Sequence, residues 1–354
     1  MKKRYTIIHT EQTDLVIHDG ATENLHEIID ATNQTSYVIL FDAETYRLFG
    51  KKAETSLQKF NKPVHIFIIE TGEASKSLST IENILSFLIE KNCDRKTTII
   101  GIGGGVVSDI ATFVGGIYYR GVNCILIPTT LLAQVDAAIG GKGGVNITDY
   151  KNIIGVIKQP NAIIIDPLVL SLLPQEQITS GMAEIIKMAI AFDRHFFNYL
   201  STVIKLDNNV LKKAIHTSVN LKMKIIQEDP LEKTNTRTAV NFGHSFGHAI
   251  ELMAKIPHGF AVAIGMVYAM EVSTKITGFS KKEMDQAIVL LRKFGLPTTI
   301  KNLSKNDVLE HMKKDKKNFG GNFRLVLLDA IGKLRIVENI DKKIIEESFH
   351  KVLI

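Results

Sequence analysis

Histidines able to bind a metal ion gather in one short stretch of the chain. His244, His248 and His258 are three of the eleven histidines and fall within fifteen residues. Upstream, Glu184 lies in an otherwise apolar segment, with Lys187 on the same predicted helix face. A carboxylate with two imidazoles supplies three protein ligands and leaves one coordination position open, as catalytic divalent-metal sites do. These residue types predict a catalytic metal site, although their spacing matches no standard zinc motif.

A second polar pattern overlaps the histidines. Arg237, Asn241, His244 and His248 are spaced at offsets of 0, 4, 7 and 11, and most residues between them are apolar. The spacing predicts a helix over Arg237–Met253 with these four side chains on one face. Burying such groups costs free energy unless something satisfies them. We therefore expect this face to line a functional site.

A glycine-rich turn follows one predicted strand of the first half of the chain. Gly103, Gly104 and Gly105 come directly after the run Thr98–Ile102 and lead into a predicted helix that carries Asp109. Glycines in this position let backbone N–H groups approach a pyrophosphate at a helix N-terminus. The match to G-x-G-x-x-G is partial, because Ser108 replaces a later glycine. Polar residues also end the neighbouring predicted strands, so we interpret this edge as a dinucleotide site.

Another polar concentration runs from Asp136 to Asn152. It holds Lys142 between two glycine pairs, and Lys151 close to its end. Four glycines around one lysine allow the backbone to fold closely about an anionic ligand. A flexible glycine loop with solvated lysines is the alternative interpretation, and the residues by themselves leave both open.

Hydrophobic periodicity places these groups on two kinds of element. In the first half, short β-branched runs alternate with helical patterns, which predicts βαβ units around a parallel sheet. From Pro174 onward the pattern is helical, apart from a late hairpin. The predicted strands are Tyr37–Phe41, Val64–Ile69, Thr98–Ile102, Cys124–Ile127 and Ala162–Ile165, with Arg324–Leu328 and Leu334–Val337 forming the hairpin. The predicted helices are Thr45–Phe60, Leu78–Lys91, Val106–Tyr118, Ile178–Leu200, Leu211–Gln227, Arg237–Met253 and Val262–Ile276.

Length and composition limit the classes of protein. A chain of 354 residues predicts two domains, which we place at 1–173 and 174–354. With 45% hydrophobic and 23% charged residues, a largely disordered chain is excluded. The longest charge-free apolar runs, 121–135 and 256–270, stop at 15 residues, so we expect no membrane span.

Cysteines and charges indicate the compartment and the partners. Cys93 and Cys124 cannot form a disulfide framework, and Glu11 and Asp14 interrupt any signal-peptide core, so we expect a cytoplasmic protein. The net charge of +6 suits anionic small molecules. Because the lysines are scattered rather than gathered in a basic tract, we expect no nucleic-acid partner.

Beyond these patterns, the chain closely resembles the 3-dehydroquinate synthase family of sugar phosphate cyclases. The resemblance extends from TGEASKS near Glu73 to IGK at Lys333. It is carried by six long segments: GGGVVSDIATFVGGIYYRG (103–121), IPTTLLAQVDAAIGGKGGVN (127–146), YKNIIG (150–155), GMAEIIK (181–187), RTAVNFGHSFGHAIE (237–251) and PHGFAVAIGM (257–266). The resemblance implies a Rossmann-like α/β N-terminal domain that binds NAD and a mainly α-helical C-terminal domain that carries Zn²⁺ or Co²⁺. It also implies an active site between the domains, and a homodimer.

The resemblance implies a role for each matching residue. The metal ligands would be Glu184, His244 and His258. The NAD contacts would be Asp42, Thr71, Gly72, Glu73, Ala74, Ser75, Lys76, Gly104, Gly105, Val106, Val107, Ser108, Asp109, Thr129, Thr130, Lys142, Lys151, Val169, Leu170, Ser171 and Leu172. The substrate and catalytic contacts would be Asp136, Lys142, Asn152, Lys187, Lys222, Arg237, Asn241, His248 and Lys333, with Arg120 reaching the substrate phosphate of a partner subunit.

The implied activity is that of a lyase in the shikimate pathway. Its substrate would be 3-deoxy-D-arabino-heptulosonate 7-phosphate, converted to 3-dehydroquinate and phosphate through transient oxidation by NAD, elimination, reduction, ring opening and aldol closure. Another sugar phosphate cyclase, such as a 2-deoxy-scyllo-inosose or valiolone synthase, remains an alternative, as does a metal-dependent polyol dehydrogenase of the glycerol dehydrogenase type. The chain departs from the family pattern at Gly143 and Leu172, where threonine is usual, and at Phe260, where glutamate is common.

Overall fold

The computed structural model describes residues 6–9, 13–29, 32–148, 150–230, 232, 235–313 and 323–354. The chain divides into two compact units, residues 1–174 (unit 1) and 175–354 (unit 2). Glu11, used above in the signal-peptide argument, lies outside the described residues.

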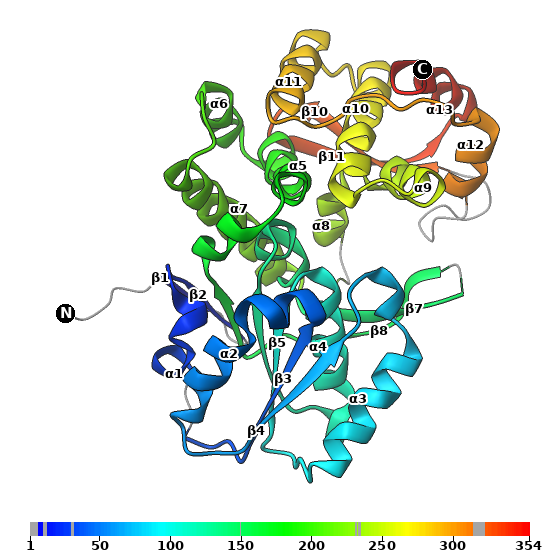
Figure 1. Ribbon diagram of the computed structural model, residues 1–354. Helices are drawn as coiled ribbons and strands as arrows, with labels where there is room; N and C mark the ends of the chain where they lie inside the picture. The colour runs from blue at the N-terminus through cyan, green and yellow to red at the C-terminus, as the bar shows by residue number, and fades with distance from the viewer. Residues whose placement is uncertain are drawn as a thin grey trace. The chain divides into compact units, whose positions relative to one another are not determined.

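Unit 1 is built on a seven-stranded sheet in the order β1-β2-β9-β6-β5-β3-β4 (Figure 1). Only β1 is antiparallel to its neighbour, and the other six strands are parallel, which confirms the predicted mostly parallel sheet. Central strands such as β5 are buried along their whole length, as expected for strands with both faces covered. The strands are β1 (Thr6–His9), β2 (Asp14–Ile17), β3 (Tyr37–Asp42), β4 (Val64–Ile69), β5 (Thr98–Gly103), β6 (Asn123–Pro128) and β9 (Ala162–Ile165).

Three of the α-helices described in unit 1 follow strands that the sequence predicted, and the first follows β2, which was not predicted. The longest begins at a capping box, in which the Asp42 carboxylate accepts the Thr45 N–H and the Thr45 hydroxyl accepts the Asp42 N–H. The α-helices are α1 (Leu25–Ile28), α2 (Ala43–Gln58), α3 (Leu78–Glu90) and α4 (Gly105–Ile117). Short helical turns complete the unit: η1 (Ala21–Glu23), η2 (Glu73–Ser75), η3 (Tyr118–Arg120), the π-helix η4 (Ala133–Ala137) and η5 (Pro167–Leu172).

The glycine-rich segment after Asp136 is a hairpin, which the predicted strands did not include. β7 (Lys142–Ile147) pairs antiparallel with β8 (Tyr150–Ile157), and β7 packs on α4 (Figure 1). A Cβ at Gly143 would lie 2.6 Å from Phe113 N and 2.9 Å from Asp109 O. Glycine therefore lets the strand lie directly against the backbone of the helix, and the interpretation as a flexible loop is wrong.

Unit 2 is mainly helical, as predicted, with a two-stranded sheet of β10 (Phe323–Ala330) and β11 (Lys333–Ile340). Its central helix, α10, contacts α5, α9, α11, α13 and β10 (Figure 1). By length and hydropathy α10 passes as a membrane span, but 78% of that window is buried inside the structure, as for a core helix. The helices are α5 (Gln175–Phe192), α6 (Arg194–Thr202), α7 (Asn208–Glu228), α8 (Asn235–Thr238), η6 (Ala239–Asn241), α9 (His244–Ala254), α10 (His258–Ile276), α11 (Lys281–Lys293), α12 (Lys305–Lys313), α13 (Lys342–Ser348) and η7 (Phe349–Lys351).

Two helices predicted as continuous are broken. The predicted helix Arg237–Met253 consists of α8, η6 and α9, separated at Gly243, whose φ is 80°. A Cβ at Gly243 would lie 2.8 Å from Met266 N, so glycine allows both the left-handed turn and the close approach of α10. The four polar groups therefore do not share one helix face, and that prediction is wrong. The predicted helix Ile178–Leu200 ends at Asp193, whose carboxylate caps α6 by accepting the Phe196 N–H.

Candidate functional site

Unit 2 brings Glu184, His244 and His258 together. Their nearest ligand atoms all lie within 4.8 Å of one another, and Glu184 Oε1 is 3.7 Å from Nε2 of each histidine. Two ligand atoms about 2.1 Å from one tetrahedral ion lie about 3.4 Å apart, close to the observed separation. Among the described residues Glu184 Oε1 is buried with no hydrogen-bond partner, and a bound cation would satisfy it. The three residues therefore fit a divalent metal ion.

Close backbone contacts position these side chains. Glu184 lies in the buried middle of α5, whereas His244 and His258 are the first residues of α9 and α10. A Cβ at Gly259 would overlap the Ser180 carbonyl, and the Gly259 N–H donates to Ser180 Oγ at 3.1 Å. Glycine thus lets the start of α10 lie against α5. This close packing places His258, on α10, next to Glu184, on α5.

Outer contacts orient the three candidate ligands. Lys187 forms a buried ion pair with Glu184 Oε2, which leaves Oε1 facing the histidines. His258 Nδ1 is 2.9 Å from Glu251 Oε2, and His244 Nδ1 is 3.2 Å from Phe242 O. With Nδ1–H donating to these oxygens, each Nε2 keeps its lone pair for a metal ion.

The electrostatics of the group favour ionised side chains. Burial by itself would raise the pKa of Glu184, but Lys187 and His258 outweigh it and lower that pKa to about 2. Burial would lower the pKa of His258, but the nearby carboxylates of Glu184 and Glu251 outweigh it and raise that pKa to about 10. Since a metal ligand must be the neutral imidazole, metal binding would release a proton from His258.

Three other predicted residues of unit 2 lie on α8, η6 and α9. The exposed His248 ring lies 5.2 Å from the His244 ring and 6.0 Å from the His258 ring, so the structure places it beside the candidate ligands. Arg237 is buried and donates from Nη1 to Pro230 O at 3.1 Å. Asn241 donates to Thr238 O at 3.2 Å from η6, which contacts α5 and β11.

Two predicted lysines of unit 2 lie in contrasting environments. Lys222 is buried on α7, which contacts α8. Lys333 begins β11 with its side chain 73% exposed and its Nζ 3.9 Å from Asp329 Oδ2.

In unit 1 the glycine turn forms the start of α4. Gly104 is the N-cap residue and has no side chain with which to cap the helix. A Cβ at Gly104 would lie 3.1 Å from Thr130 Cγ2, and one at Gly105 would lie 3.3 Å from Ala137 Cβ. No side chain of Gly104 therefore caps the first N–H groups of this 13-residue helix. A turn that binds pyrophosphate needs such N–H groups to be available to the ligand.

A charged network lies beside this turn. The buried Lys76 Nζ is 2.5 Å from Asp109 Oδ2 and 3.9 Å from Glu73 Oε1. Burial raises the pKa of Asp109 to about 6, although Lys76 opposes that shift. Asn146 donates to Glu73 Oε1 at 2.8 Å and accepts the Asn152 N–H at 3.0 Å, so it joins the hairpin to η2. Sequence patterns predict no role for Asn146, although it stands in the polar segment before Asn152.

The remaining predicted residues of unit 1 are spread over several of its elements. Asp42 ends β3 and caps α2, at the same carboxyl edge of the sheet as the glycine turn. Lys142 and Lys151 are exposed on the hairpin, and Arg120 is exposed after the C-terminus of α4, at the other end of that helix from Gly104. The rest lie as follows: Asp136 in η4; Thr71, Gly72, Ala74 and Ser75 around η2; Val106, Val107 and Ser108 in the first turn of α4; Thr129 after β6; Val169, Leu170, Ser171 and Leu172 in η5.

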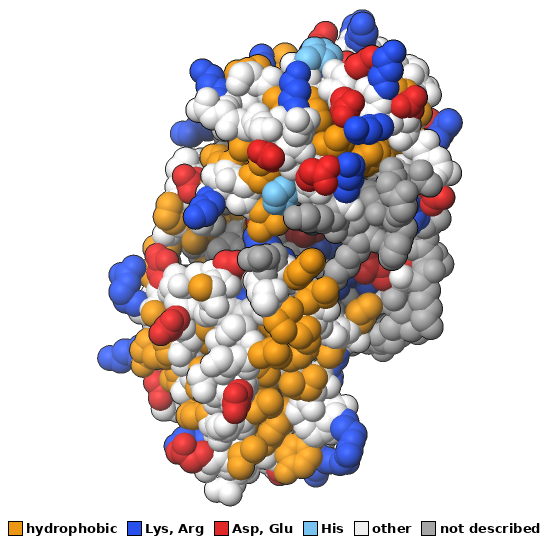
Figure 2. Space-filling model, turned by 90° about the vertical axis from the view of Figure 1, so that its right-hand side faces the viewer, with side chains coloured by type: hydrophobic (Ala, Val, Ile, Leu, Met, Phe, Trp, Pro, Cys, Tyr) orange, Lys and Arg blue, Asp and Glu red, His pale blue; other side chains and the backbone are white. Residues whose placement is uncertain are grey.

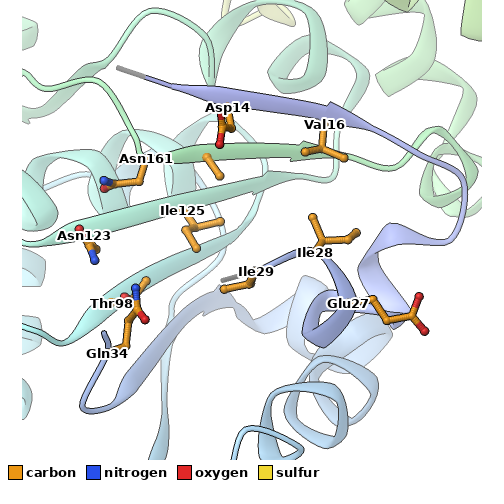
Figure 3. A pocket seen from close by; sticks show the side chains of 11 residues that line it. Asp14, Val16, Glu27, Ile28, Ile29, Gln34, Thr98, Asn123, Ile125 and Asn161 are labelled. Carbon is orange, nitrogen blue, oxygen red and sulfur yellow. The ribbon is translucent and has the colours of Figure 1, made fainter. Parts of the chain in front are cut away.

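A cavity of about 440 Å³ in unit 1 does not coincide with these groups (Figure 3). Asp14, Thr98 and Asn123, the first residues of β2, β5 and β6, line it with apolar residues such as Val16 and Ile125. Because parallel strands start at the edge opposite to the one where they end, this cavity lies away from the glycine turn.

Comparisons with known proteins identify the family of the chain. The family model of the 3-dehydroquinate synthase N-terminal domain matches residues 66–180, and that of the C-terminal domain matches residues 181–318. A 3-dehydroquinate synthase of Helicobacter hepaticus is 41% identical over 344 residues, covering 95% of this chain and 94% of the relative. One of Sulfurovum sp. is 40% identical over 308 residues, covering 85% of this chain and 87% of the relative.

Solved structures share the fold. A 2-deoxy-scyllo-inosose synthase complexed with carbaglucose-6-phosphate, NAD⁺ and Co²⁺ superposes with a TM-score of 0.89 at 26% identity, over 99% of this chain and 100% of that one. A 2-epi-5-epi-valiolone synthase from Streptomyces hygroscopicus has a TM-score of 0.86 at 24% identity, over 98% of each chain. The family models and the curated relatives span most of the sequence, and the chain therefore belongs to the 3-dehydroquinate synthase family of sugar phosphate cyclases.

Proposed function

We propose that this protein is a 3-dehydroquinate synthase, a lyase that converts 3-deoxy-D-arabino-heptulosonate 7-phosphate to 3-dehydroquinate and phosphate. The single observation that carries the proposal is the group of Glu184, His244 and His258, found in a chain of this family. Its three ligand atoms leave a position open for substrate, as catalytic metal sites do.

The proposal includes NAD and one divalent metal ion, Zn²⁺ or Co²⁺. When bound, the metal polarises the hydroxyl that is oxidised, and NAD takes up and returns the hydride. Glu184, His244 and His258 would hold the metal, and the N–H groups at Gly104 and Gly105 would bind the pyrophosphate of NAD. In support, the 2-deoxy-scyllo-inosose synthase structure carries NAD⁺ and Co²⁺.

Side chains of unit 2 would bind and orient the substrate. Arg237 would hold its carboxylate or phosphate with paired N–H donors, assisted by Lys222 and Lys333. His248, exposed beside both ligand histidines, would move a proton through water. Lys187 would hold the second oxygen of Glu184, in addition to the substrate contact implied by the sequence resemblance.

The residues of unit 1 divide between cofactor and substrate in this proposal. Lys76, Asp109 and Glu73 would contact NAD as one network of ion pairs beside the glycine turn. Asn152, tied to that network through Asn146, would face the substrate together with Asp136 and Lys142. Asp42, Lys151 and the predicted residues around η2, in the first turn of α4, after β6 and in η5 would make the remaining contacts to NAD.

We also propose a cytoplasmic homodimer. Hydrophobic side chains gather on the face of unit 1 that carries the β7–β8 hairpin (Figure 2). On this hairpin Ile147, Tyr150, Ile153 and Ile157 are each at least 40% exposed. An exposed apolar edge strand of this kind is suited to a protein interface, and Arg120 would depend on that association.

A 2-deoxy-scyllo-inosose synthase is the second candidate, because the solved structure of that enzyme superposes closely on this chain. Identity of 26% to that enzyme, against 41% to the Helicobacter hepaticus relative, favours the first candidate.

Phosphate release distinguishes these functions. The purified protein is supplied with 3-deoxy-D-arabino-heptulosonate 7-phosphate, catalytic NAD and Co²⁺ or Zn²⁺, before and after chelation. We expect phosphate in large excess over NAD, no accumulation of NADH, and loss of activity on chelation. Release only from glucose 6-phosphate would establish the second candidate, and stoichiometric NADH from a simple polyol would indicate a dehydrogenase.

A further inference from the structure

The carboxylate of Glu251 lies beside the metal group and has no role in the function proposed above. Glu251 lies on α9, seven residues after His244, and its side chain is only 14% exposed. Its Oε2 is 2.9 Å from Nδ1 of His258. Between α9 and α10 the chain reverses at Lys255, whose φ is 50°, and this turn brings the first residue of α10 back to Glu251.

We propose that Glu251 is a positioning residue for the metal ligand His258, an inference that rests on the metal-dependent function proposed above. A carboxylate at Nδ1 keeps the proton on that nitrogen, so Nε2 is left as the ligand atom. The same hydrogen bond fixes the rotation of the ring, with Nε2 directed toward Glu184 Oε1 at 3.7 Å. The negative charge makes the imidazole a more basic ligand.

The two ligand histidines differ in the group that their Nδ1 atom faces. Nδ1 of His244 faces the neutral carbonyl of Phe242 at 3.2 Å, a backbone group that cannot be removed by substitution. Nδ1 of His258 faces a charged side chain, and Glu251 is its hydrogen-bond partner among the described residues. The backbone therefore orients His244, whereas the side chain of Glu251 orients His258. Only the hydrogen bond to His258 can be removed by substituting its partner.

A second arrangement must be separated from this one. His248, Glu251 and His258 also present ligand atoms within 4.8 Å of one another. If the metal were held there, Glu251 would be a ligand and His248 would be required. In the arrangement we propose, His248 contributes nothing to metal affinity.

The experiment measures the affinity of the full chain for Co²⁺ and Zn²⁺, by competition with a chromophoric chelator and without substrate. Loss of an outer hydrogen bond of this kind weakens metal binding by about 10–100-fold. We expect a Kd increase of about tenfold in Glu251→Gln, which keeps an acceptor oxygen, and about 100-fold in Glu251→Ala. The visible absorption of bound Co²⁺ is expected to shift in Glu251→Ala, because the ring is no longer held.

Glu346→Gln is the matched control, since Glu346 is an exposed carboxylate of α13 that pairs with Lys342, and its Kd is expected to equal that of the unaltered protein. An unaltered Kd in folded Glu251→Ala would overturn the inference, as would loss of metal in His248→Ala. If Glu251→Ala does not fold, an unaltered Kd and Co²⁺ spectrum in Glu251→Gln would overturn it. Failure of the unaltered protein to bind metal would instead remove the proposed function itself.

Discussion

The metal group of unit 2 consists of side chains from three helices, whereas the glycine turn of unit 1 consists of backbone between one strand and one helix. Glu184, His244 and His258 are up to 74 residues apart in the sequence. Gly103, Gly104 and Gly105 are consecutive and join β5 to α4. One site thus depends on long-range packing and on charge, and the other on local conformation and on the absence of side chains.

This difference predicts how each site fails. Removing a charged side chain from the metal group leaves a buried charge without its partner, which costs several kcal/mol. Adding a side chain near the glycine turn forces packed backbone apart, which costs about 1–3 kcal/mol. Failure of either site is expected to leave the other intact.

The largest effect is expected from Glu184→Ala. Loss of the ligand abolishes metal retention and activity, and the buried Lys187 loses its ion pair, so stability falls by about 3–5 kcal/mol. Metal content after dialysis and the midpoint of thermal unfolding measure both effects. His258→Ala is expected to lose the metal with a smaller loss of stability. Full metal occupancy in either variant would contradict the assignment of the ligands.

Arg237→Ala is expected to separate substrate binding from both cofactor sites. Loss of its charge-assisted contacts lowers kcat/KM by about 10²–10³-fold, because the interaction is strongest in the transition state. NAD affinity and metal content are expected to stay unaltered, and calorimetric titration of NAD serves as the control. Substrate kinetics equal to those of the unaltered protein would remove Arg237 from the site.

Asp109 is expected to make unit 1 sensitive to pH. Its pKa is raised to about 6 in the folded chain, against about 4 when unfolded, so the folded state binds more protons between these values. Stability from this group therefore falls as pH rises from about 4 to about 6, by roughly 2–3 kcal/mol, and is constant above. Denaturant unfolding of the unaltered protein and of Asp109→Asn, compared across this pH range, isolates the effect. If the free energy of unfolding of both proteins changed with pH in the same way, this effect of Asp109 would be excluded.

The smallest of these effects is expected from Gly143→Ala. Its Cβ would meet Phe113 N at 2.6 Å, so β7 must move away from α4 at a cost of about 1–3 kcal/mol. Because the hairpin reaches Glu73 through Asn146, NAD affinity is expected to fall as well. Co²⁺ affinity is the internal control, and its loss in this variant would show that the two sites are not independent.

Local patterns predicted much of the fold. The five predicted strands of the sheet agree with β3, β4, β5, β6 and β9 to within one residue at each end, because fully buried parallel strands are continuous apolar runs bounded by turns. β1 and β2 were not predicted, and neither was the β7–β8 hairpin. Glycines at 143, 144 and 155 weaken a strand pattern, and their purpose, close contact with α4 and between the two strands, is visible only after folding.

The sequence by itself determined the residue types of both sites, the glycine turn after β5 and the helical character of unit 2, since each depends on neighbours along the chain. Only the tertiary structure decided which residues meet. Gly243 breaks the helix predicted over Arg237–Met253, and Gly259 lets α10 lie against α5, so that His244 and His258 both reach Glu184. The role of Glu251 depends on the reversal at Lys255. Periodicity carries no information about such contacts, because they depend on backbone approach between segments far apart in the sequence.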